Sequence, residues 1–247
     1  MKRYIMNSGG KDSMATCIIR YEKYGYGGGV DGVVMGELMF SHKDNISAEH
    51  PKTYKWKHEV AIPKLEQMGY NVHLVKSEHD YLSLFHKRFK LSKDENKNGL
   101  KWGFVIASAC NLKLYGKVLA MDYWCKQQGE FEKILGYAFD EKKRIESMLR
   151  TPNISSTLYE EKIIEAQTYD ICRQYGLLSP IYETKKRDGC WFCPNQSVKD
   201  MAKFAKEYPH YWALLEELAK DKELASQNFR FGKTFAEINV LITEINR

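Results

Sequence analysis

The chain has 247 residues, of which 43% are hydrophobic and 13% aromatic, so it can bury a core and we expect a globular chain rather than a disordered one. No uninterrupted apolar run approaches the roughly 18 residues of a spanning helix, and the N-terminus leads into a strand-like segment rather than a signal peptide. We therefore expect a cytoplasmic protein with no membrane partner.

The net charge of +6 favours anionic partners. The lysines are scattered, so an anionic small molecule explains this charge as well as nucleic acid does. Six cysteines are too few for a disulfide scaffold, and we expect them to be reduced and available as ligands. The oligomeric state stays open, a homo-oligomer included.

The first part of the chain alternates between strand and helix patterns. Strands are predicted over 3–7, 30–40 and 71–75, with helices over 13–24 and 54–68 between them. Parallel neighbouring strands need crossover connections, so this order predicts a doubly wound, mostly parallel α/β sheet.

The next part predicts a loop, a strand and a helix. Residues 91–101 are polar and lysine-rich, as in an exposed loop, and an apolar segment ending at Ala138 predicts a fourth strand. Thr157 and Glu160 have the spacing of a capping box, which predicts one helix reaching Tyr175.

The last third is predicted to be helical. Ser197 and Thr234 are each followed three residues later by an acidic residue, as at helix starts. We expect an α/β domain over 1–150 and a helical C-terminal region over 151–247, packed on the first and carrying a cysteine-containing loop.

A polar, glycine-containing segment lies between the first strand and the first helix. Backbone N–H groups and the helix dipole can surround a phosphate there. Lys11 would neutralise phosphate charge, hydroxyl groups would donate to its oxygens, and Asp12 would orient the loop or a Mg²⁺ ion. The ordinary P-loop has glycine where Ile5 stands, so this is a different loop. A glycine turn with chance polar residues is the alternative. The segment consists of Ser8, Gly9, Gly10, Lys11, Asp12 and Ser13.

A second glycine pattern, Gly27, Gly29 and Gly32, formally fits G-x-G-x-x-G. It follows a predicted helix and precedes a strand, the reverse of the order that a dinucleotide site requires. We therefore assign it no ligand.

Cys190 and Cys193 form a C-x-x-C turn, a spacing that lets two thiolates meet one metal. Cys110 and Cys172 could complete a four-thiolate site for zinc or an iron–sulfur cluster. Cys172 lies within a predicted helix and could equally be a buried apolar residue. A thioredoxin-like dithiol fits less well, because the motif comes late in the chain.

The segment Ser8 to Ser13 resembles the PP-loop of the adenine nucleotide alpha-hydrolase superfamily, and further segments resemble its phosphoadenosine phosphosulfate (PAPS) reductase branch. The resemblance extends from about Tyr4 to Trp212. The further segments are Glu49-His50-Pro51, Leu135-Gly136-Tyr137 with Asp140-Glu141 and Arg144, Leu178 to Tyr182, and Gly189 to Pro194.

This resemblance implies an enzyme that binds ATP or an adenylyl sulfonucleotide through residues 8–13, with Lys11, Asp12 and Arg144 in catalysis. Cys110 with the C-x-x-C pair is similar to the cluster cysteines of adenylylsulfate reductases. Those enzymes carry two adjacent cysteines where this chain has Ala109-Cys110.

The favoured activity is adenylation or sulfur transfer with release of pyrophosphate, on a nucleic acid or with a sulfur-donor protein. A true sulfonucleotide reductase is the first alternative, although its C-terminal catalytic cysteine has no counterpart after Cys193. A non-catalytic nucleotide-binding subunit of a phage or defence nucleic-acid modification complex is the second.

Overall fold

The computed structural model describes residues 1–105 and 110–246. The chain forms two compact units, each assembled from three separate stretches. Unit 1 comprises residues 1–37, 50–77 and 117–188, and unit 2 comprises 38–49, 78–116 and 189–247. Residues 151–188, expected in the C-terminal region, therefore group with the α/β unit. No helix in the described ranges is long and apolar enough to cross a membrane.

Unit 1 is built on a five-stranded sheet in which all paired strands are parallel, in the order β5-β2-β1-β6-β7. This confirms the predicted fold class. Its strands are β1 (Lys2–Asn7), β2 (Gly32–Glu37), β5 (Val72–Lys76), β6 (Phe131–Ile134) and β7 (Ile154–Ser155).

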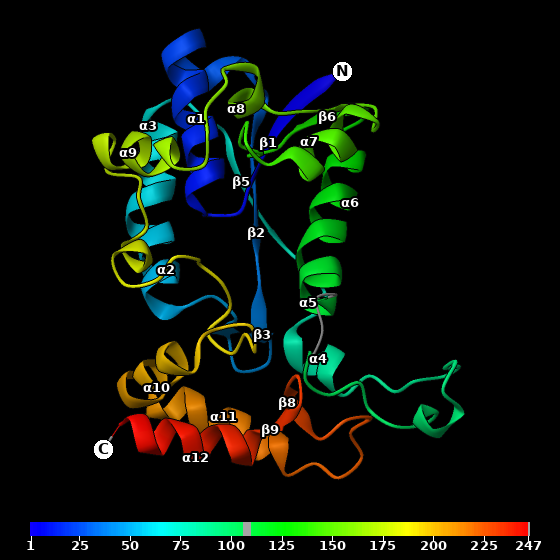
Figure 1. Ribbon diagram of the computed structural model, residues 1–247. Coiled ribbons are helices and arrows are strands. Elements are labelled where there is room, and N and C mark those ends of the chain that lie inside the picture. Colours follow the sequence, from blue (N-terminus) through cyan, green and yellow to red (C-terminus); the bar gives the residue numbers. More distant parts are fainter. Residues whose placement is uncertain (106–109, 247) are drawn as a thin grey trace. The chain divides into compact units, whose positions relative to one another are not determined.

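Helices cover both faces of this sheet (Figure 1). Ile5 of β1 points into a cluster with the helices on one face, whereas its neighbour Tyr4 points into a cluster on the other. This alternation is the period-two pattern of a strand buried on both sides. The helical segments of unit 1 are α1 (Lys11–Tyr24), η1 (Tyr26–Gly29), α2 (Pro51–Trp56), η2 (Lys57–Ala61), α3 (Ile62–Gln67), α6 (Leu119–Gln127), α7 (Lys142–Leu149), α8 (Thr157–Glu160), α9 (Gln167–Gln174) and η5 (Pro180–Glu183). The segment η4 (Leu114–Val118) spans the division between the units.

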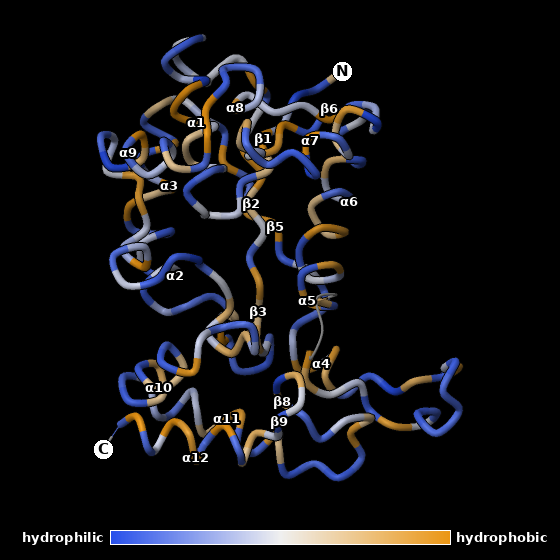
Figure 2. Tube along the Cα trace, viewed as in Figure 1, coloured by the Kyte–Doolittle hydropathy of each residue, from blue (hydrophilic) through white to orange (hydrophobic). Residues whose placement is uncertain are grey.

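Unit 2 has an aromatic core in which Trp191 packs against Phe40 and Phe204, with ring centroids 4.8 and 5.7 Å away. Figure 2 shows apolar residues recurring along the C-terminal helices of this unit. Its elements are β3 (Met39–Ser41), β4 (Ile46–Ser47), α4 (Tyr81–Phe85), η3 (Glu95–Lys97), α5 (Asn111–Lys113), α10 (Val198–Glu207), α11 (Pro209–Ala219), β8 (Asn228–Arg230), β9 (Lys233–Thr234) and α12 (Phe235–Ile245).

Several predicted boundaries change in the structure. The apolar run over 30–40 is two strands in different sheets, since β2 ends at Glu37 and β3 pairs with β4. The helix predicted from Thr157 is capped by Ser156 instead, and α8 ends at Glu160, shortly before Lys162 adopts a positive φ of 57°. The helix starts predicted at Ser197 and Thr234 are confirmed by their caps.

Candidate functional site

The loop after β1 is held by Asn7, a fully buried residue at the carboxyl end of the strand. Its side-chain oxygen accepts hydrogen bonds from the Gly9 backbone nitrogen at 2.7 Å and from the Ser13 hydroxyl at 3.0 Å. Gly9 has a φ of 81°, which glycine adopts without strain. The Ser8 backbone nitrogen donates to Ser13 Oγ at 3.1 Å, so the two serines hold the loop at both ends.

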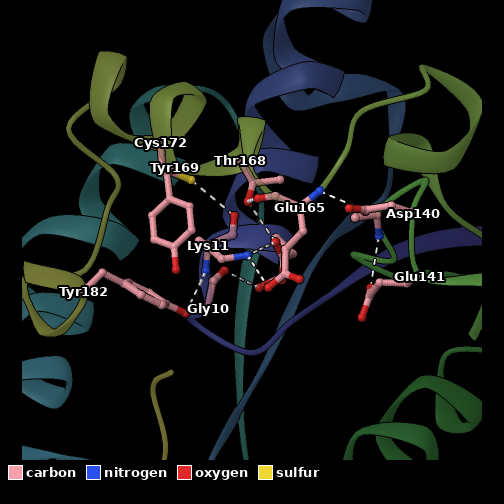
Figure 3. Close-up of polar contacts among 12 residues, drawn as sticks. Gly10, Lys11, Asp140, Glu141, Glu165, Thr168, Tyr169, Cys172 and Tyr182 are labelled. Atoms are coloured by element: carbon pink, nitrogen blue, oxygen red, sulfur yellow. Dashed lines mark hydrogen bonds and ion pairs between the residues drawn. The ribbon is translucent and has the colours of Figure 1, made fainter. Parts of the chain in front are cut away.

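Lys11 is the first residue of α1, and only 3% of it is exposed. Its Nζ lies 2.6 Å from Asp12 Oδ1 and 3.0 Å from Glu165 Oε1 (Figure 3). Burial alone lowers the pKa of Lys11, but the hydrogen bonds and charges of these two carboxylates outweigh burial and raise it. Lys11 is therefore a fixed, fully charged cation at the start of the helix.

Residues from the α9 and η5 segments complete this arrangement. Thr168 Oγ1 donates to Asp12 Oδ1 at 2.8 Å, and the Lys11 backbone nitrogen donates to the Tyr182 hydroxyl at 3.3 Å. The Tyr169 ring lies 4.9 Å from Lys11 Nζ. Three aromatic or hydroxyl side chains from 168–182 thus surround the cation and its carboxylate.

Gly136, just beyond β6, lies against the loop. A Cβ atom at this position would be 2.7 Å from the Ser13 backbone nitrogen and 2.8 Å from the Asp12 carbonyl carbon, closer than packed atoms approach. Because β6 pairs with β1, the segments leaving their carboxyl ends meet at this point. In the strand order, β2 lies on one side of β1 and β6 lies on the other, so the order in which strands are added reverses at β1. Open α/β sheets bind ligands at such a reversal.

Arg144, predicted to act on phosphate, contacts side chains of its own segment. Its Nη1 lies 2.7 Å from Glu141 Oε1, and its guanidinium stacks 4.1 Å from the centre of the Tyr137 ring. Burial lowers the pKa of Arg144, but the Glu141 carboxylate outweighs burial and raises it. The contact between this segment and the Lys11 group comes through Asp140, whose carboxylate accepts from the Glu165 backbone nitrogen at 3.0 Å.

Glu37 is a residue of this sheet edge that the sequence analysis missed. It ends β2, is 2% exposed, and lies 3.3 Å from His58 Nε2 and 3.2 Å from Lys76 Nζ. A buried carboxylate at the carboxyl end of a parallel strand is a functional candidate, because ligands of open α/β sheets bind outside the carboxyl ends of the strands. An acidic residue ending a continuous apolar run is the signal that could have identified it.

The four predicted metal-ligating cysteines divide between the units. Cys172 lies in unit 1, where its Sγ donates to the Lys11 carbonyl at 3.2 Å, and burial raises its pKa to about 12. The other three lie in unit 2, where burial first and then their charges raise the pKa of the Tyr81 hydroxyl. Those three are Cys110, Cys190 and Cys193.

No set of three or more His, Cys, Asp or Glu side chains over 1–105 and 110–246 is placed to hold a metal ion. The turn containing Cys190 is closed by a hydrogen bond from the Cys193 backbone nitrogen to its carbonyl at 3.1 Å. The structure thus shows the C-x-x-C turn but no four-thiolate site in the described part. Ala109, the position where the sequence departs from the reductase pattern, lies outside the described residues.

No family model matches the sequence, and no curated protein matches it. Among solved structures, the chain is similar to the crystal structure of phosphoadenylyl-sulfate (PAPS) reductase from Candida auris in its phosphate complex. The TM-score is 0.48 with 12% sequence identity, over 77% of this chain and 82% of that chain. At this level the likeness is one of backbone arrangement, and it assigns no activity to this chain.

Proposed function

We propose that this chain is an enzyme that binds ATP at residues 8–13 and uses it for adenylation or sulfur transfer, with release of pyrophosphate. The observation that carries the proposal is the buried Lys11 ammonium at the start of α1, beside a loop shaped by Gly9. A buried charge needs compensation, and a site that holds one at a helix N-terminus suits an anionic ligand.

The surroundings of Lys11 support phosphate binding. The N-cap residue Gly10 has no side-chain cap, so no side chain of that residue competes for the N–H groups of the first turn. Glu165, the more distant partner of Lys11, is 56% exposed at its side chain and could turn toward solvent. A phosphate would then take its place beside the ammonium group.

Asp12, and Glu165 once it has released Lys11, would supply carboxylates to a magnesium ion that accompanies the nucleotide. Mg²⁺ is commonly held by one or two carboxylates together with phosphate oxygens and water, so two carboxylates near one phosphate position are sufficient. When bound, the ion would neutralise phosphate charge.

In the proposed reaction, a nucleophile of the acceptor attacks the α-phosphorus of ATP. A new bond forms between them, the bond from that phosphorus to the β-phosphate oxygen breaks, and pyrophosphate leaves with the electron pair. The contribution of Lys11 is to stabilise the charge that gathers on the phosphate oxygens. The Tyr169 ring lies beside the ammonium group, and Thr168 and Tyr182 orient Asp12 and the Lys11 backbone.

The reductase alternative requires a cysteine that attacks sulfur, and the chain has no cysteine after Cys193. Calorimetric titration with ATP·Mg²⁺ and with PAPS separates the two. We expect ATP to bind more tightly, whereas a clear preference for PAPS would favour the reductase. The non-catalytic alternative predicts bound ATP and no pyrophosphate with any acceptor tested.

A further inference from the structure

The loop predicted over 91–101 is part of a projecting segment of unit 2, which we call the basic arm (residues 87–101). In Figure 1 the basic arm is the extended green segment that follows α4. Its two sides pair through bridges from Arg88 to Lys101 and from Phe89 to Asn98. The Phe89 backbone nitrogen donates to the Leu100 carbonyl at 2.9 Å. The arm is therefore anchored by backbone pairing at its base.

The charges of the arm are unevenly compensated. Six of its residues are Lys or Arg and two are acidic. At the base, Arg88 is neutralised by Glu223 at 2.7 Å and Lys101 by Asp221 at 2.7 Å. Over the described ranges, Lys87, Lys90 and Lys93 are exposed and form no ion pair. The arm thus carries three exposed cations at every third position, and none of them is in an ion pair over 1–105 and 110–246.

An aromatic cavity of about 460 Å³ lies at the base of the arm, within unit 2. Trp102 lines this cavity, and its ring centroid lies 6.0 Å from that of Phe89 and 6.3 Å from that of Tyr115. Lys87 Nζ lies 4.7 Å from the Trp102 ring and 5.3 Å from the Tyr115 ring. An exposed cation therefore stands over the aromatic lining.

We propose that the basic arm and this cavity bind single-stranded nucleic acid, with a base among the Phe89, Trp102 and Tyr115 rings. Aromatic rings provide stacking for any base, and neighbouring lysines follow the phosphates, which is the combination that single-strand binding uses. A duplex keeps its bases stacked inside, so it could reach the lysines but not the cavity. Because the arm is basic, an anionic ligand fits it better than a basic or neutral ligand does.

This surface lies in unit 2, and its binding of nucleic acid is independent of the phosphate loop in unit 1. Its identification as the site that recruits the acceptor of the adenylation or sulfur transfer does rest on the proposed function. The two failures can be told apart, because Lys11→Ala should weaken ATP binding at least tenfold and leave oligonucleotide binding unchanged.

The test uses fluorescence anisotropy of the full chain with labelled single-stranded DNA, single-stranded RNA and duplex DNA of equal length. We expect the single strands to bind more tightly than the duplex. The double substitution Lys90→Glu with Lys93→Glu should weaken binding more than tenfold and reduce the slope of log affinity against log salt by about 1.4, since each lost phosphate contact removes about 0.7. Phe89→Leu should weaken single-strand binding about tenfold and leave duplex binding unchanged.

The matched control is Lys203→Glu with Lys206→Glu, which makes the same change in net charge at exposed positions of α10. It should retain most of the affinity. Equal losses from the two double variants would overturn the proposal, because net charge alone would then explain binding. Binding of poly-glutamate as tight as that of single-stranded nucleic acid would contradict base binding in the cavity. The same conclusion would follow if Phe89→Leu kept both the single-strand affinity and the melting temperature of the wild type.

Discussion

The ammonium group of Lys11 lies 3.0 Å from the carboxylate of Glu165, a residue 154 positions later in the chain. This pair joins the loop after β1 to the segment before α9. It also means that the cation proposed to bind phosphate is paired with a carboxylate in this structure. In the proposed complex, a phosphate would take the place of that carboxylate beside Lys11.

Lys11→Ala should weaken ATP binding at least tenfold, because a charge-assisted contact to phosphate contributes about 1.5–3 kcal/mol. Calorimetric titration measures it. Lys23→Ala is the control, since Lys23 lies in the last turn of the same helix and pairs with Glu161. Unchanged affinity of Lys11→Ala for both ATP and PAPS would remove the phosphate site from residues 8–13.

Glu165→Gln should strengthen ATP binding in the absence of divalent metal by about twofold to fivefold, the range of one exposed charge pair. The glutamine no longer competes with phosphate for Lys11. In excess Mg²⁺ the gain should shrink, because the variant also loses a carboxylate suited to the ion. Glu161→Gln is the control, and an equal gain in that variant would mean that only net charge had changed.

Gly136→Ala should destabilise unit 1 by about 1–3 kcal/mol and reduce ATP affinity, because the added methyl group meets the backbone of Asp12 and Ser13. Urea unfolding and calorimetry measure the two effects. Gly189→Ala is the control, since its Cβ would have nothing within 4 Å. If Gly136→Ala had the same urea unfolding curve as the wild type, the close approach of Gly136 to the loop would not contribute to stability.

Asp80→Ala should destabilise unit 2 by about 2 kcal/mol through loss of the α4 N-cap. The Asp80 carboxylate accepts from the Ser83 and His42 backbone nitrogens at 2.7 Å each. Burial opposes the charged form, but these hydrogen bonds outweigh it and lower the pKa of Asp80 below 3.8.

A lowered folded-state pKa means that this contribution is present above pH 3.8 and is lost as pH falls through the folded-state value. The difference in unfolding free energy between wild type and Asp80→Ala should therefore be full at pH 7 and smaller near pH 3. Urea titrations at both values measure it, and an equal difference at both would contradict the role of the ionised carboxylate.

The C-x-x-C spacing predicts a metal site, and the structure predicts different effects on that site for substitution of Cys190 and of Cys172. If unit 2 holds zinc or an iron–sulfur cluster, Cys190→Ser should release the metal and lower the melting temperature, because metal binding contributes to folding. Cys172→Ser should keep the metal, since Cys172 contacts the Lys11 carbonyl in unit 1. Elemental analysis and visible spectra of anaerobically purified protein measure this, and metal-free wild-type protein would contradict the hypothesis.

Local features of this protein were determined by short stretches of sequence. The strand, glycine turn and helix around Lys11 were predictable because each depends on neighbouring residues, as were the caps at Ser197 and Thr234. The glycine pattern at 27–32 follows α1 and runs into β2, in the helix-then-strand order that the sequence predicts.

The tertiary structure decided what those features contact. Nothing near Lys11 in sequence indicates that Glu165 and Tyr182 reach it, because pairing over that separation depends on how the sheet and α9 pack. The same holds for Gly136, whose need to be glycine arises only from β6 lying beside β1. A division of the chain at residue 150 could not describe the two units, because each unit is built from three separate stretches. A hydrophobic core forms from segments that are close in space, whatever their order in the chain.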